Sequence, residues 1–158
     1  MRLALAAAFA VAIAFSLPAC GALDGMNCTE MACSDAVSVD FEPAFSEPGA
    51  YEVAAAWEGG TLTCAVTLPA GSPRADECES SISGPFPGEV VLGGEGHEIL
   101  RGVWVRSAPP SIEITVRHEG VVVASSRLEP SYRKHHPNGE ECDGDYFCRV
   151  SQTKLVRE

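Results

Sequence analysis

Cysteine is the residue type with the most evident chemistry in this chain of 158 residues. The seven cysteines are Cys20, Cys28, Cys33, Cys64, Cys78, Cys142 and Cys148. An odd number in an exported protein leaves one thiol over, unless one cysteine is modified or removed. The other six can form three disulfides in an oxidising compartment. Zinc is not predicted, because no Cys-x-x-Cys pair occurs.

The simplest hypothesis joins cysteines that are near neighbours in the chain: Cys28 with Cys33, Cys142 with Cys148, and Cys64 with Cys78. The last pair lies symmetrically about Gly71, in the turn-forming run Pro69-Ala70-Gly71-Ser72-Pro73. Two antiparallel strands that fold back at this turn would place these two cysteines opposite each other. Other connectivities stay open, since six cysteines do not define their own pairing.

Histidines and acids near the end of the chain could bind a metal. The residues concerned are His135, His136, Asp143 and Asp145, with Glu140 and Glu141 between them. Imidazoles are common metal ligands, and clustered carboxylates suit calcium. However, neighbouring residues in a strand point to opposite faces, and no EF-hand spacing follows Asp143. We therefore predict neither a bound metal nor another cofactor, with a metal-binding lipoprotein as an alternative.

One glycine-rich loop carries a potential general base. It is Gly93-Gly94-Glu95-Gly96-His97-Glu98, and it has neither the lysine nor the following helix of a phosphate-binding loop. Neither Gly-x-Ser-x-Gly nor His-Glu-x-x-His occurs in the chain. No catalytic residue is assigned, and we expect a protein that is not an enzyme. A small envelope enzyme or inhibitor that uses loop histidines and acids is the alternative.

The first residues have the pattern of an export signal. Arg2 is followed by an apolar run from Leu3 to Phe15 and then by small residues. This run is shorter than the roughly 20 residues that a membrane-spanning helix needs. The chain is therefore expected to leave the cytoplasm.

Leu17-Pro18-Ala19-Cys20 resembles the lipobox of bacterial lipoproteins, which is a leucine, a variable residue, a small residue and a cysteine. In that family the cysteine sulfur receives diacylglycerol, the signal is cut before it, and the new amine is acylated with a chain such as palmitate. The resemblance implies lipidation of Cys20 and anchoring to a membrane of the cell envelope. Gly21, directly after this cysteine, resembles the residue at the same position in lipoproteins sent to the outer membrane. Pro18 departs from the usual residue types, and cleavage after Ala22 would instead give a secreted protein.

The mature chain is acidic. Without Arg2 it has 10 basic and 22 acidic side chains, a net charge of −12. Such a surface repels phosphate backbones, so nucleic acid is not an expected partner. The predicted partners are the membrane, through the lipid on Cys20, and a further protein of the envelope.

Strict alternation of apolar and polar residues predicts half-buried strands after residue 34. Alternation is clear in Val37–Phe41, Tyr51–Trp57, Leu62–Leu68 and Ile112–His118, and Ile99–Arg106 and Val121–Leu128 are further expected strands. Glu119-Gly120 is typical of a two-residue hairpin turn. Weaker strands are expected at 78–83, at the sheet edge at 89–92, and at a second edge at 146–153, tied by a 142–148 bridge. Four aromatic residues, Phe41, Tyr51, Trp57 and Trp104, are expected in the core rather than as a carbohydrate platform.

These patterns predict an all-β protein with about seven strands, arranged as a single disulfide-braced β-sandwich. Its architecture is similar to the immunoglobulin-like and transthyretin-like modules of cell surfaces. The expected organisation is a signal peptide at 1–19, a tether with the first cysteine pair at 20–33, the sandwich at 34–129, and a cysteine-containing segment at 130–158 that packs on it. We expect a non-catalytic binding or structural module of the cell envelope.

Overall fold

The computed structural model describes residues 31–70, 77–81 and 87–157. The export signal, the lipobox and Cys28 lie outside these residues. The described chain is mostly β-structure, as its sequence predicted. No helix within it is both long and apolar enough to cross a lipid bilayer.

Ten strands and one short helix make up the described residues. In chain order they are β1 (Ala36–Phe45), β2 (Gly49–Trp57), β3 (Gly60–Leu68), β4 (Glu77–Ser80), β5 (Gly88–Gly93), β6 (Ile99–Val105), β7 (Ile112–His118), β8 (Val121–Leu128), β9 (Arg133–His135), α1 (Glu140–Asp143) and β10 (Cys148–Val156). The number of strands exceeds the seven or so expected. β4 corresponds to the weaker strand expected at 78–83, whereas β9 was not predicted, because three residues are too short to show alternation.

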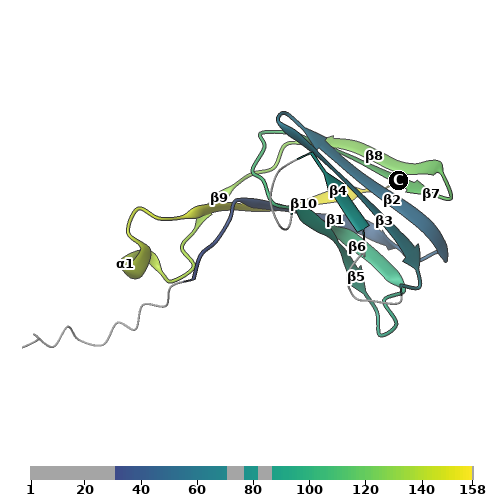
Figure 1. Cartoon of the computed structure of the whole chain (residues 1–158), viewed down its shortest axis with the longest axis horizontal. Coiled ribbons are helices and arrows are strands. Elements are labelled where there is room, and N and C mark those ends of the chain that lie inside the picture. Colours follow the sequence, from purple (N-terminus) through teal and green to yellow (C-terminus); the bar gives the residue numbers. More distant parts are fainter. Residues whose placement is uncertain (1–30, 71–76, 82–86, 158) are drawn as a thin grey trace, which may run out of the picture.

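The strands form two sheets of five. The first has the order β5-β6-β1-β10-β9, and the second has the order β4-β3-β2-β7-β8. Figure 1 shows the two sheets as layers, with β2 and β7 of the second over β1 and β6 of the first. The alternating apolar side chains of both inner faces meet in one core, including Val39, Val53, Val103 and Val116, which are fully buried. The arrangement is that of a β-sandwich.

The hairpin between β7 and β8 is where the sequence placed it. Its two loop residues, Glu119 and Gly120, both have positive φ angles, of 50° and 78°. This backbone conformation matches the right-handed twist of the flanking strands. The turn fixes the position of His118, the last residue of β7.

The last strand corrects an expectation. β10 does not lie at an edge, but between β1 and β9. It runs parallel to β1, with Ala36 opposite Val150 and Phe41 opposite Leu155. Leu155 is almost completely buried, so the end of the described chain contributes to the core.

One of the three predicted disulfides is confirmed. Cys64 and Cys78 face each other across β3 and β4 and are bonded. The pairs Cys28–Cys33 and Cys142–Cys148 are wrong, because Cys33 is bonded to Cys148 over a sequence separation of 115. The cause is the parallel pairing of β1 and β10, which brings Cys33, just before β1, close to Cys148, the first residue of β10. Cys142 is also disulfide-bonded.

A slender projection extends from one end of the sandwich (Figure 1). We call it the arm: residues 31–35 together with residues 133–147, which include β9 and α1. The backbone of Cys33 exchanges two hydrogen bonds with the hydroxyl of Tyr146, at 3.0 and 3.2 Å. The backbone of Met31 is held likewise by the side chain of Asn138. The arm therefore joins the beginning of the described chain to the segment before β10.

An ion pair closes the base of the arm. The carboxylate of Asp35 accepts hydrogen bonds from the backbone N–H of Arg149 at 2.7 Å and from its guanidinium at 2.9 and 2.5 Å. The side-chain hydrogen bond from Arg149 lowers the pKa of Asp35 below its ordinary value of 3.8, against the opposing effect of burial. The stability that the pair contributes is therefore present above about pH 4 and is lost as the pH falls through the lowered pKa.

Replacement of this carboxylate gives a pH-dependent prediction. We expect Asp35→Asn to lower the melting temperature by a few degrees at pH 7, and the difference from the unmodified protein to shrink below about pH 4. Thermal unfolding followed by circular dichroism from neutral to acid pH measures both. Glu95→Gln, in the exposed loop between β5 and β6, is the control. Equal melting temperatures at pH 7 would show that the ion pair does not stabilise the arm.

Candidate functional site

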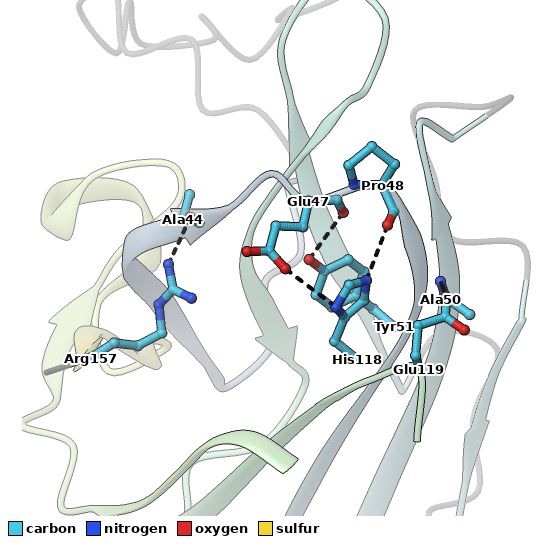
Figure 2. A network of polar contacts seen from close by, with 8 residues as sticks. All are labelled: Ala44, Glu47, Pro48, Ala50, Tyr51, His118, Glu119 and Arg157. Carbon is cyan, nitrogen blue, oxygen red and sulfur yellow. Dashed lines mark hydrogen bonds and ion pairs between the residues drawn. The ribbon is translucent and has the colours of Figure 1, made fainter. Parts of the chain in front are cut away.

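A cluster of polar contacts lies where two turns meet (Figure 2). The turn between β1 and β2 lies against the turn between β7 and β8. Glu119 joins them: its backbone N–H donates to the carbonyl of Ala50 at 2.9 Å, and its carboxylate accepts from the N–H of Ala50 at 2.6 Å. We call this arrangement the turn clamp, consisting of Glu47, Pro48, Tyr51, His118 and Glu119.

His118 is the centre of the turn clamp. Its ring stacks on Tyr51, with 4.4 Å between the ring centroids. Nε2 lies 3.2 Å from the carbonyl oxygen of Pro48, and Nδ1 lies 3.6 Å from the carboxylate of Glu47. Because a carbonyl oxygen can only accept a hydrogen bond, the contact with Pro48 requires a proton on Nε2.

A glycine allows the two turns to approach. Gly49 has a φ of +137°, which side-chain-bearing residues rarely adopt. A Cβ at this position would lie 2.5 Å from Oε1 of Glu119 and 2.6 Å from Nε2 of His118. Both of these atoms bind the backbone next to Gly49, so neither can move without the loss of a hydrogen bond.

A small cavity adjoins the turn clamp. Its volume is about 150 Å³, and it is lined in part by Phe45, Tyr51, His118 and Arg157. Arg157 covers the ring of Phe45 at 4.0 Å and donates to the carbonyls of Pro43 and Ala44. This volume is below the roughly 300 Å³ of typical ligand pockets.

The contacts of the turn clamp indicate a structural role rather than a catalytic one. The hydroxyl of Tyr51 donates to the backbone carbonyl of Glu47, and burial, followed by the charge of Glu47, raises the pKa of this phenol. Both nitrogens of His118 face oxygens of the neighbouring turn. An imidazole held in this way would have to leave these contacts to act as a general base. The cluster therefore holds two turns together at one end of the sandwich.

The metal candidates of the sequence all lie in the arm, but they do not form a metal site. The carboxylate of Asp143 accepts two hydrogen bonds from Asn138, at 2.7 and 2.9 Å. Desolvation would raise the pKa of Asp143, but these bonds and the charges of His136 and His135 lower it. Asp143 thus stabilises the turn that begins at Pro137. Within the described ranges, no three residues among His, Cys, Asp and Glu are placed to hold a metal ion.

In the loop between β5 and β6, a carboxylate also binds the backbone of the same loop. Glu98 accepts a hydrogen bond from the N–H of Gly96 at 2.8 Å. The carbonyl of His97 accepts from the N–H of Ala70 at 3.1 Å, and His97 itself has a positive φ of 53°. These contacts shape the loop, and they do not align Glu98 with His97 as a catalytic pair.

The sequence did not single out His118, Glu47 or Arg157. The available signal was local: Pro48-Gly49 and Glu119-Gly120 both mark turns, and His118 ends an alternating strand. The pairing of β2 with β7, which places Tyr51 opposite His118, could not be read from it. No known protein family, curated protein or solved structure matches the chain.

Proposed function

We propose that this protein is a lipoprotein of the bacterial cell envelope, lipidated on Cys20, in which a non-catalytic β-sandwich serves as a binding or structural module. The disulfides Cys33–Cys148 and Cys64–Cys78 support this proposal, because they suit an oxidising compartment. Met31, which Asn138 holds in the arm, stands eleven positions after Cys20. Eleven residues span at most about 40 Å even when fully extended. The arm would therefore lie between the membrane and the sandwich.

The architecture supports display from a surface. Short strands in two antiparallel-rich sheets, braced by disulfides, are similar to immunoglobulin-like and transthyretin-like modules, and we propose a fold of this kind. Disulfides suit an oxidising compartment outside the cytoplasm. The arm is held to the sandwich by Cys33–Cys148 and by the pair of Asp35 with Arg149. The sandwich would thus be presented on a stiff base, with its far end directed away from the bilayer.

The intact mass of the protein extracted from membranes tests the anchor. We expect a chain that begins at Cys20 and carries acyl groups, and that gains six alkyl groups with a thiol reagent only after reduction. The variant Cys20→Ala should lose the acyl mass and remain in the soluble fraction or unprocessed. A lipid-free mass that begins elsewhere would contradict anchoring. Thiols that react before reduction would contradict the disulfide-braced module.

The binding role is tested separately. Cross-linking in intact cells, followed by affinity purification under denaturing conditions, should recover the same envelope component in repeated experiments. A protein anchored in the same way but of unrelated fold serves as the control. Recovery of the same components by both proteins would contradict a specific binding role.

A further inference from the structure

One tryptophan lies on the outside of the first sheet. Phe41 and Tyr51 are buried in the core as predicted, and Trp57 packs against it. Trp104 differs, because its neighbours in β6, Val103 and Val105, are fully buried and point inward. The alternation of β6 directs Trp104 to the outer face, where it is half-buried. An indole on this face is available for binding.

A hollow adjoins this indole. Its volume is about 600 Å³, within the range of roughly 300–1,000 Å³ that is typical of ligand sites. It crosses the middle strands of the sheet, because Ser38 of β1 lies opposite both Trp104 of β6 and Gln152 of β10. The side chains of Ala36 and Ser38 are small, which leaves space between Trp104 and Arg133 of β9.

The chemistry of the hollow is that of a polar ligand with a flat apolar side. Trp104 supplies an aromatic face, and Ser38 and Arg133 supply a hydroxyl and a guanidinium. Gln152 adds its amide oxygen, while its amide nitrogen donates to Asp40 at 2.7 Å. Sugar rings have an apolar C–H face that stacks on an indole, and hydroxyl groups at their edges that hydrogen-bond to such side chains. The described lining contains one cation, Arg133, and no carboxylate. Two acids border it: Asp40, which accepts the hydrogen bond from Gln152, and Glu89 of β5, which lies opposite Trp104. A carboxylate on the ligand would match Arg133.

We propose that this hollow binds an acidic saccharide, with the sugar ring stacked on Trp104 and its carboxylate held by Arg133. An extended peptide fits less well. Peptides add to sheets through unpaired backbone groups at an edge. Most of the hollow instead lies over β6, β1 and β10, whose backbones pair with strands on both sides, and β9 is the edge strand that reaches it, through Arg133. This inference rests on the proposed binding role of the module, but not on the lipid anchor.

Fluorescence titration tests the proposal. The chain has two tryptophans, so Trp57→Phe leaves Trp104 as the reporter. The detergent-solubilised mature protein is titrated with trigalacturonate and with soluble glycan strands of peptidoglycan, both of which carry carboxylates, and with neutral galactotriose. We expect a saturable change with at least one acidic probe and weaker binding of the neutral sugar. The absence of a saturable change with either acidic probe at millimolar concentrations would overturn the proposal.

Two variants, measured by calorimetry against the acidic probe that binds, assign the residues. Trp104→Ala should reduce affinity at least about tenfold, and Arg133→Gln about tenfold for the acidic probe only. Arg127→Gln, on β8 of the second sheet, is the matched control and should bind as the unmodified protein does. Unchanged affinity in Trp104→Ala or Arg133→Gln would overturn the proposal. Recovery of a specific protein partner without saccharide binding would refute this inference and leave the proposed function standing.

Discussion

Replacement of both Cys64 and Cys78 by alanine is expected to lower the free energy of unfolding by about 3 kcal/mol. The bridge closes a segment with a sequence separation of 14, and in the chain-entropy account it restricts the unfolded chain by this amount. Cys64 is also fully buried in the core, and its strand β3 pairs with the four-residue edge strand β4. Urea unfolding of the oxidised mature protein, with the other cysteines intact, measures the loss.

The adjacent pair provides a matched control for this variant. Thr63 lies opposite Glu79 in the same two strands, on the outer face. Replacement of both by alanine should change stability by less than about 0.5 kcal/mol, as is usual for surface positions. If the two double variants unfold at the same urea concentration, the disulfide does not stabilise the protein by restricting the unfolded chain.

Gly49→Ala is expected to lower the free energy of unfolding by about 3 kcal/mol, and this is the second large effect that we expect. A residue with a side chain at this φ is strained by about 1–3 kcal/mol. The new methyl group would also displace the carboxylate of Glu119 and the ring of His118 from their backbone partners, and each lost hydrogen bond costs about 1 kcal/mol. Chemical unfolding measures the total. Protection of the Ala50 amide from hydrogen exchange reports locally on the turn clamp, and it should fall.

Substitution of a second glycine distinguishes the effect of backbone strain from the effect of the lost hydrogen bonds. Gly59, in the turn between β2 and β3, has a φ of +98° and open space where a Cβ would lie. Gly59→Ala should therefore show only the backbone cost and should destabilise less than Gly49→Ala by about 2 kcal/mol. Equal losses in the two variants would show that the turn clamp contributes nothing beyond its backbone conformation.

The local patterns of the sequence predicted a large part of the sandwich. Alternation located β2, β3 and β7 within two residues, because one face of each strand is buried and the other is solvated. β8 was located from the Glu119-Gly120 turn, and its residues are exposed or half-buried. The pairing of Cys64 with Cys78 followed from the same reasoning, since it depends on two strands joined by one turn. Features within a hairpin are determined by residues close in sequence, and sequence patterns reveal them.

Long-range features were predicted incorrectly or missed. The place of β10 beside β1 depends on which strands pack together, and not on the alternation of either strand. Because this pairing was not predicted, the partner of Cys33, the arm and the ion pair of Asp35 with Arg149 could not be predicted either. Trp104 was assigned to the core by residue type, although its neighbours Val103 and Val105 already occupy the inward positions of β6.

The parallel contact between β1 and β10 has a consequence for the order of events as the chain is made. Cys33 emerges 115 residues before Cys148, and both Cys64 and Cys78 emerge in between. An oxidant that acts on cysteines as they appear would join consecutive residues, and consecutive pairing is wrong for Cys33. The native bond must await the last strand or arise by thiol–disulfide exchange. Correct maturation would therefore depend on a disulfide isomerase, or on an oxidant slow enough to let the two sheets assemble first.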